Sequence, residues 1–287
     1  MRQNLQHGAI YAVAGAAAFA TMGALVKLAA AELPNPMVVF LRNAFGLLIL
    51  LPWLLQPGLT GLATRRPWAH LLRAAAGLTA MYCFFFAISR MQLANAVLLN
   101  YSQPLFIPFI AWLWLGERPA RRILPAVLIG FVGVALILKP DAGLVSPVGL
   151  IGLAAGVLAA VAMVAIRALS TTEPATRTVF YFTTLGTLIS LGPAVYLWQS
   201  PSTGAWLAML GAGGFATLGQ ILLTRAYSVA PAAHVGSLIY AAVIFAGLWG
   251  WWIWAEIPDL FSLAGTVLVV AAACLVVFAR RSQPAEE

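Results

Sequence analysis

The chain has 287 residues, of which 62% are hydrophobic and only 8% are charged, whereas about a quarter of the residues of an ordinary soluble domain are charged. So few charged residues cannot cover a water-facing surface, which excludes a soluble catalytic domain. A membrane-spanning helix needs about 20 mostly apolar residues, and such stretches recur along the whole sequence. The composition therefore predicts an all-α membrane protein embedded in a lipid bilayer.

Ten apolar stretches follow one another in chain order, separated by short connections. We predict spans over residues 8–31, 37–55, 68–89, 94–115, 122–138, 147–169, 177–198, 204–227, 232–254 and 260–279. Prolines in the connections, such as Pro34, Pro57, Pro140 and Pro201, are typical of helix ends. Membrane-spanning strands would be about 10 residues long and alternate in polarity. These stretches are longer and apolar on every side, so a β-barrel is excluded.

The net charge of +8 is compatible with a nucleic-acid partner, but the placement of the basic residues indicates membrane orientation instead. With a cytoplasmic amino terminus and ten spans, the residues at the inner face are Arg2, Arg65, Arg66, Arg73, Arg118, Arg121, Arg122, Arg167, Arg177, Arg225, Arg280 and Arg281. Those at or towards the outer face are Lys27, Arg42, Arg90 and Lys139. The positive-inside rule expects this asymmetry. Both termini are therefore predicted to be cytoplasmic, and no nucleic-acid partner is expected.

The first span has an alternative interpretation as a secretory signal peptide, because Arg2 precedes an apolar run that ends in three alanines, Ala29 to Ala31. The run is longer than the core of about 7 to 15 residues that such signals have, and Lys27 lies inside it. We therefore expect a retained span. Cys83 and Cys274 both fall within predicted spans, where cysteine behaves as a small hydrophobe, so no disulfide is expected.

The two halves of the sequence resemble each other. With a shift of 139 residues, Tyr101, Trp112, Glu117 and Pro119 fall on Tyr240, Trp251, Glu256 and Pro258, and with a shift of 141, Gly15 and Glu32 fall on Gly156 and Glu173. We therefore divide the chain into five-span repeats at residues 1–140 and 141–287. Five is an odd number, so the second repeat has to enter the membrane inverted. Inverted repeats are an architecture of secondary transporters, whose substrate site lies between the repeats near the midplane.

Two motifs in the first half carry a family resemblance, and the second half departs from the pattern. Asn100-Tyr101-Ser102-Gln103-Pro104-Leu105-Phe106, followed by Leu115-Gly116-Glu117-Arg118, resembles the fourth helix of the drug/metabolite transporter (DMT) superfamily and the Gly-Glu that closes it. Arg42-Asn43 is similar to that superfamily's Arg-Phe, with Asn in place of Phe. In the second half, Tyr240-Ala241-Ala242-Val243 lacks the Gln-Pro, and Ala255-Glu256 replaces the Gly-Glu.

This resemblance covers nearly the whole chain and implies the ten-helix form with two EamA-type repeats, at residues 1–140 and 141–287. Within the superfamily the chain resembles the YddG-like aromatic amino-acid exporters. The resemblance thus implies amino-acid export across the inner membrane.

Polar residues inside the spans are the candidates for a substrate site, because lipid cannot satisfy their hydrogen bonds. The candidate substrate-binding residues are Lys27, Arg42, Thr79, Tyr82, Asn100, Tyr101, Gln103, Gln220, His234, Ser237 and Tyr240. The alternative is that such side chains join neighbouring helices, at about 1 kcal/mol or less each. Pro104 and Pro108 interrupt the fourth span at mid-depth, and an interrupted polar span at a repeat interface is the best pointer to a site.

Charged residues near the span ends have structural alternatives. Lys27 and Arg42 either snorkel to the outer interface or pair with Glu32, or they line an outward-facing cavity that attracts carboxylates. Glu117 and Glu256 are expected to complement the dipoles of the helices that follow them, worth about 0.3–1 kcal/mol each.

No carboxylate is placed at mid-membrane, so the substrate gradient is the expected driving force. If protons are coupled, His234 or Glu32 are the expected carriers. Gly152 and Gly156 are expected to let two helices approach closely.

The predicted function is secondary export of small amphipathic metabolites, neutral or aromatic amino acids first, by alternating access around a central cavity between the repeats. A cationic substrate would need a mid-depth carboxylate, which the sequence lacks. The alternative is a multidrug or nucleotide-type metabolite carrier of the same fold. Without a phosphate loop, His-x-x-x-His spacing or paired carboxylates, we expect no enzyme, no cofactor and no metal. We expect a monomer, with an oligomer as the alternative.

Overall fold

A computed structural model describes residues 5–54, 63–116, 124–138, 146–229, 235 and 238–281. Its helices, in chain order, are α1 (Leu5–Ala29), α2 (Asn35–Leu54), α3 (Pro67–Arg90), α4 (Leu93–Asn100), α5 (Gln103–Leu115), α6 (Leu124–Leu138), α7 (Pro147–Ser170), α8 (Ala175–Tyr196), α9 (Thr203–Val229), α11 (Ala241–Trp254) and α12 (Leu260–Arg281). Within the described ranges there is no strand. Among the described residues, seven segments are long and apolar enough to cross a membrane, α4 and α5 together forming one of them, and α6, α11 and α12 supply shorter apolar helices. The predicted all-α class is confirmed.

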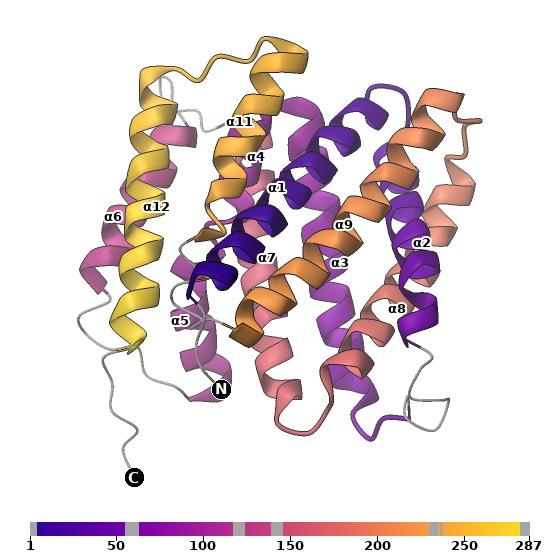
Figure 1. The fold of residues 1–287 in the computed structure, drawn as a ribbon, viewed down its shortest axis with the longest axis horizontal. Coiled ribbons are helices and arrows are strands. Elements are labelled where there is room, and N and C mark those ends of the chain that lie inside the picture. Colours follow the sequence, from indigo (N-terminus) through magenta and orange to yellow (C-terminus); the bar gives the residue numbers. More distant parts are fainter. Residues whose placement is uncertain are drawn as a thin grey trace.

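The helices form one bundle in which the main contacts join the first half of the chain to the second (Figure 1). α1 packs on α9, α3 on α7, α2 on α8 and α6 on α12. If α1, α2 and α3 correspond to α7, α8 and α9, the α1–α9 contact is equivalent to the α3–α7 contact. The beginning of α1 and the end of α12 lie at the same end of the bundle, which we call the terminal end.

Glycines allow two helix contacts, α6 with α12 and α7 with the end of α4, to be unusually close. On α6 and α12, a Cβ on Gly133 would lie 2.8 Å from the Gly265 carbonyl oxygen, and one on Gly265 would lie 2.6 Å from the Gly133 carbonyl oxygen. On α7, a Cβ on Gly156 would lie 2.5 Å from the Leu99 carbonyl oxygen. The expectation that Gly156 allows close packing is therefore met, and its neighbour is the end of α4.

The fourth apolar stretch is two helices, because the chain turns at Tyr101 and Ser102. Pro104, in the first turn of α5, has no N–H to donate and its ring excludes a helical carbonyl four residues earlier. A second turn at Ile239 and Tyr240 precedes α11, although no proline lies there. The span predicted over 232–254 is therefore interrupted at Ile239 and Tyr240, and Tyr240 is the repeat equivalent of Tyr101 in the first turn.

Both broken helices end in a left-handed residue. Gly116, after α5, has φ 73°, and Ala255, after α11, has φ 53°. These two residues are 139 positions apart, so they are equivalent in the repeat. Glycine adopts this conformation without strain, whereas a Cβ costs about 1–2 kcal/mol.

Ala255→Gly is therefore expected to stabilise the protein by about 1 kcal/mol, and Gly116→Ala to destabilise it by a similar amount. A Cβ at Gly116 would meet no atom within 4 Å, so the second change reports backbone conformation alone. Thermal unfolding of the purified protein in detergent measures both. Equal unfolding temperatures for Ala255→Gly and the unchanged chain would contradict the left-handed conformation.

Candidate functional site

The two helix breaks meet inside the bundle. The Tyr240 hydroxyl donates a hydrogen bond of 2.9 Å to the Tyr101 carbonyl oxygen, and the two rings lie 6.3 Å apart between centroids. In a continuous helix that carbonyl would accept from the N–H of Leu105, which here bonds to the Ser102 carbonyl oxygen at 2.9 Å instead. The break thus frees a carbonyl group, and the other half of the chain uses it.

Several of the predicted polar residues lie close to this point in the chain. Asn100 ends α4 and Gln103 begins α5, and both are half-buried. The Gln103 Oε1 atom is buried without a hydrogen-bond partner, and so is the hydroxyl of Tyr82 on α3. Buried polar atoms are normally paired, so these two atoms are candidates to bind a polar molecule.

The remaining predicted residues lie elsewhere or outside the described part. Thr79 on α3 and Gln220 on α9 are exposed on the surface of the bundle. His234 and Ser237 lie outside the described residues. Arg42 is buried on α2, and its Nη1 donates to Asn43 Oδ1 at 3.2 Å.

Lys27 forms an ion pair at the end of the bundle opposite the termini, but its partner is not the predicted one. Its Nζ donates to Glu256 Oε1 and, at 2.8 Å, to the Met91 carbonyl oxygen. Glu256 Oε2 also accepts from the Leu93 N–H at 2.8 Å. The predicted pairing of Lys27 with Glu32 is therefore wrong. Glu256 was expected to complement the dipole of the helix that follows it, and this is also wrong, because its carboxylate lies at the start of α4. Asp259 accepts from Ser262 N at 2.8 Å at the start of α12.

Two carboxylates that are equivalent in the repeat make equivalent contacts at opposite ends of the bundle. Glu32, between α1 and α2, accepts from the Ser202 N–H at 2.5 Å and from its hydroxyl at 2.6 Å. Glu173, between α7 and α8, accepts from the Thr64 hydroxyl at 2.7 Å. Each contact joins one half of the chain to the other. Hydrogen bonds from the Ser202 side chain and backbone lower the pKa of Glu32 below its ordinary value.

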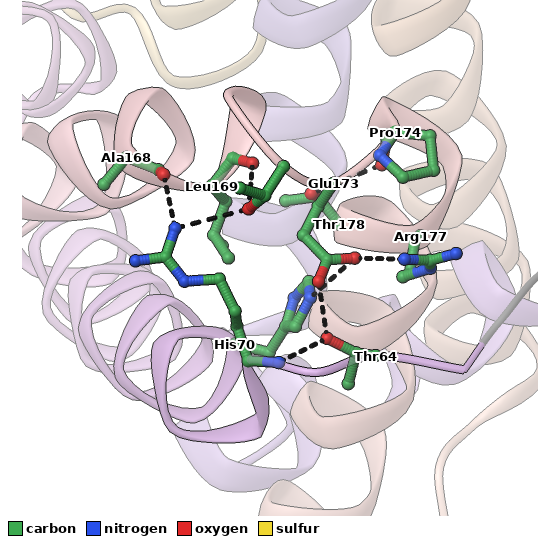
Figure 2. Close-up of polar contacts among 10 residues, drawn as sticks. Thr64, His70, Ala168, Leu169, Glu173, Pro174, Arg177 and Thr178 are labelled. Atoms are coloured by element: carbon green, nitrogen blue, oxygen red, sulfur yellow. Dashed lines mark hydrogen bonds and ion pairs between the residues drawn. The ribbon is translucent and has the colours of Figure 1, made fainter.

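Glu173, at the terminal end, interacts with more residues than Glu32 does (Figure 2). Arg177 Nη1 donates to Glu173 Oε2 at 2.5 Å, and His70 Nε2 lies 3.8 Å from the same oxygen. His70 is buried and stacks on Tyr181 with 4.5 Å between ring centroids. His70 is not among the residues predicted from the sequence, because its neighbours in the chain do not distinguish it. The carboxylate near it, Glu173, lies between α7 and α8, far away in the sequence.

Glu173 is expected to make stability depend on acid pH. Burial raises its pKa, but hydrogen bonds from Thr64 and Arg177 and the nearby charges of Arg177 and His70 outweigh it, so the pKa lies below the ordinary 4.5. The folded pKa is lower than the unfolded one, so this stabilisation is complete above about pH 4.5 and is lost as the pH falls through the folded value.

In the measurement, the unfolding temperature of Glu173→Gln should lie below that of the unchanged protein near pH 7, and the gap should narrow below about pH 4.5. Glutamine keeps an acceptor for Thr64 but carries no charge, so it isolates the ionised form. A gap that is constant across this range would mean that the charge of Glu173 has no part in stability.

A family model for the EamA-like transporter family matches residues 6–139 and 147–278. The chain belongs to the EamA-like transporter family. This transporter is therefore not an enzyme, and the apolar helices make it a multi-pass protein of the cell membrane.

Curated relatives of this EamA-like transporter carry different small molecules. It is 36% identical over 273 residues to a pseudopaline exporter of Pseudomonas aeruginosa, covering 93% of this chain and 95% of that protein. It is 26% identical to an S-adenosylmethionine uptake transporter of Rickettsia bellii, over 85% of this chain and 84% of the other. It is 27% identical to a riboflavin transporter of Vibrio cholerae, over 92% and 90% of the two chains. Small-molecule transport is common to all three.

A solved crystal structure shares the fold. It aligns with a TM-score of 0.65 and 19% identity, over 99% of this chain and 100% of that chain.

Proposed function

We propose that this EamA-like transporter is a secondary exporter of small amphipathic metabolites, with neutral and aromatic amino acids the first to test. The observation that carries the proposal is the meeting of two broken helices at Tyr101 and Tyr240. Broken helices at a repeat interface free backbone groups where a substrate can bind. Of the predicted set, Tyr82, Asn100, Tyr101, Gln103 and Tyr240 are the residues we assign to substrate.

Alternating access is supported by the two repeat-equivalent carboxylates. Glu32 bonds to Ser202 at one end of the bundle and Glu173 to Thr64 at the other. Each contact joins the two halves, so breaking one while keeping the other would open one end. In this proposal ten spans form two inverted repeats, residues 1–140 and 141–287, with both termini in the cytoplasm. The Glu173 contact then closes the cytoplasmic side.

Orientation can be measured with reporters fused in the connections. A reporter after Arg66 should read cytoplasmic and one after Pro201 should read external. Two reporters on the same side of the membrane would contradict the inverted arrangement.

Counterflow into proteoliposomes loaded with unlabelled phenylalanine tests the transport function itself. Tyr101→Ala and Tyr240→Ala should lower the initial rate of labelled phenylalanine entry by about tenfold, a loss of about 1.4 kcal/mol of substrate contact, with a smaller loss of folded yield. Tyr196→Ala is the matched control, because Tyr196 is 87% exposed at the end of α8, and it should transport normally. Normal transport by both inner variants would place the substrate elsewhere.

A second candidate is a nucleotide-type carrier, which the S-adenosylmethionine and riboflavin transporters among the relatives favour. The same counterflow assay decides between the two. Inhibition by S-adenosylmethionine or riboflavin that exceeds inhibition by phenylalanine would favour this second candidate.

A further inference from the structure

Two arginines, Arg42, which is buried, and Arg73, which is half-buried, have no carboxylate partner within the part of the chain that the structure describes. Lys27 pairs with Glu256, and Arg177 pairs with Glu173. Arg42 on α2 is only 9% exposed, and its Nε has no hydrogen-bond partner. Arg73 on α3 has Nε and Nη1 buried without a partner. Among the described residues, no carboxylate forms an ion pair with either guanidinium group.

An arginine without a carboxylate partner in a poorly solvated place destabilises the folded protein unless an anion binds to it. Arginine stays protonated in proteins, so it cannot avoid the cost by losing its charge. A charge removed from water without a partner is strongly unfavourable. Charged residues inside membrane segments therefore mark functional sites more often than structural ones.

The Arg73 guanidinium group occupies a position shaped for it. Its Cζ lies 3.8 Å from the centroid of the Phe182 ring on α8, a stacking that holds the plane of the group. A Cβ on Gly77, one turn further along α3, would collide with Arg73 Nη1 and would lie 2.8 Å from Phe182 Cε2. The side chain thus points along α3 away from the terminal end, and Gly77 leaves the room that it needs.

α8 contacts both Arg73 and Asn43, the hydrogen-bond partner of Arg42. Phe182 contacts Arg73, and Gly186, four residues later, faces the Asn43 amide, because a Cβ on Gly186 would lie 3.6 Å from Asn43 Cγ. Asn43 Oδ1 in turn accepts from Arg42. Four residues are about one helical turn, a rise of about 6 Å. Arg73 and Asn43 therefore contact the same face of α8, one turn apart, and Arg42 is hydrogen-bonded to Asn43.

We propose that Arg42 and Arg73 form a two-point anion site, and that the preferred substrate carries two carboxylates. This rests on the proposed transport function and narrows its substrate class. Arg42 takes one carboxylate and Arg73 the other, since a planar guanidinium group is suited to a carboxylate.

The test compares phenylalanine with 4-carboxyphenylalanine, which differs only by a second carboxylate across the ring. In counterflow competition on the unchanged protein, 4-carboxyphenylalanine should compete about tenfold or more better than phenylalanine. Arg73→Gln should remove that preference while leaving competition by phenylalanine within about twofold. Arg42→Gln should weaken both competitors. Arg90→Gln is the matched control, because Arg90 is exposed at the other end of α3, and it should keep the preference.

The outcomes separate this inference from the proposed function. Equal competition by both compounds on the unchanged protein overturns the two-point site and leaves transport of phenylalanine standing. Absence of counterflow with either compound overturns the proposed function. If Arg73→Gln does not fold, Arg73→Lys is the second variant, because it keeps the charge without the planar stacked group. Full retention of the preference for 4-carboxyphenylalanine by Arg73→Lys would contradict a carboxylate held by the guanidinium plane.

Discussion

Gly156→Ala is expected to destabilise the protein by roughly 2–3 kcal/mol. The added Cβ would lie 2.5 Å from the Leu99 carbonyl oxygen and 2.7 Å from Ser102 Oγ. The first of these is a backbone atom at the end of α4, next to the helix break, and it cannot move aside as a flexible side chain does. α7 would have to separate from the break, which would also disturb the contact between Tyr101 and Tyr240.

Gly15→Ala is the matched control, since Gly15 is the repeat equivalent of Gly156. Its added Cβ would have its nearest neighbours, on α9, at 3.5 Å, which is ordinary van der Waals contact. Folded yield and unfolding temperature in detergent should fall for Gly156→Ala and stay near the starting values for Gly15→Ala. Equal losses for the two variants would show that α7 does not pack against the break as described.

Lys27→Met is expected to cost about 3–5 kcal/mol, because it leaves the Glu256 carboxylate in a poorly solvated place without its cation. The two side chains are 11% and 16% exposed, and the Lys27 ammonium also lies 5.1 Å from the Trp254 ring centroid. The pair joins α1 and the end of α11 to the beginning of α4. Its loss should therefore loosen the bundle at the end opposite the termini.

A double-mutant cycle isolates the charge interaction. Glu256→Gln retains an oxygen for the Leu93 N–H while removing the charge, and the double variant Lys27→Met/Glu256→Gln has neither charge. Unfolding temperatures should show the double variant to be less destabilised than the two single losses added together. Additive losses would mean that the two groups do not interact in the folded protein.

The sequence determined the fold class and the family because both depend on local features. Apolar stretches of about 20 residues predict membrane helices wherever they occur, and the Gln103-Pro104 motif interrupts one of them through the missing N–H of proline. The repeat was visible because Tyr101, Gly15 and Glu32 have counterparts at a fixed spacing. The exact repeat boundaries, the ten spans and the side on which the termini lie stay predictions.

Tertiary structure decided which residues meet. Lys27 pairs with Glu256, 229 residues away, rather than with nearby Glu32, because packing of α1 against α11 sets the distance between charges. No proline in the sequence indicates the turn at Tyr240. The Tyr240 hydroxyl donates a hydrogen bond to the Tyr101 carbonyl oxygen in the other half of the chain.

Equivalent positions also acquire different surroundings. Gly15 and Gly156 match in sequence, yet only Gly156 lies against a broken backbone. Arg73 was assigned to the inner face by the positive-inside rule, and its stacking on Phe182 became visible only with α8 in place. The physical reason is the same throughout. Apolar composition and helix-breaking prolines act within one helix, so they can be recognised in the sequence. Ion pairs, close contacts and unpaired buried charges depend on side chains that lie far apart in the sequence.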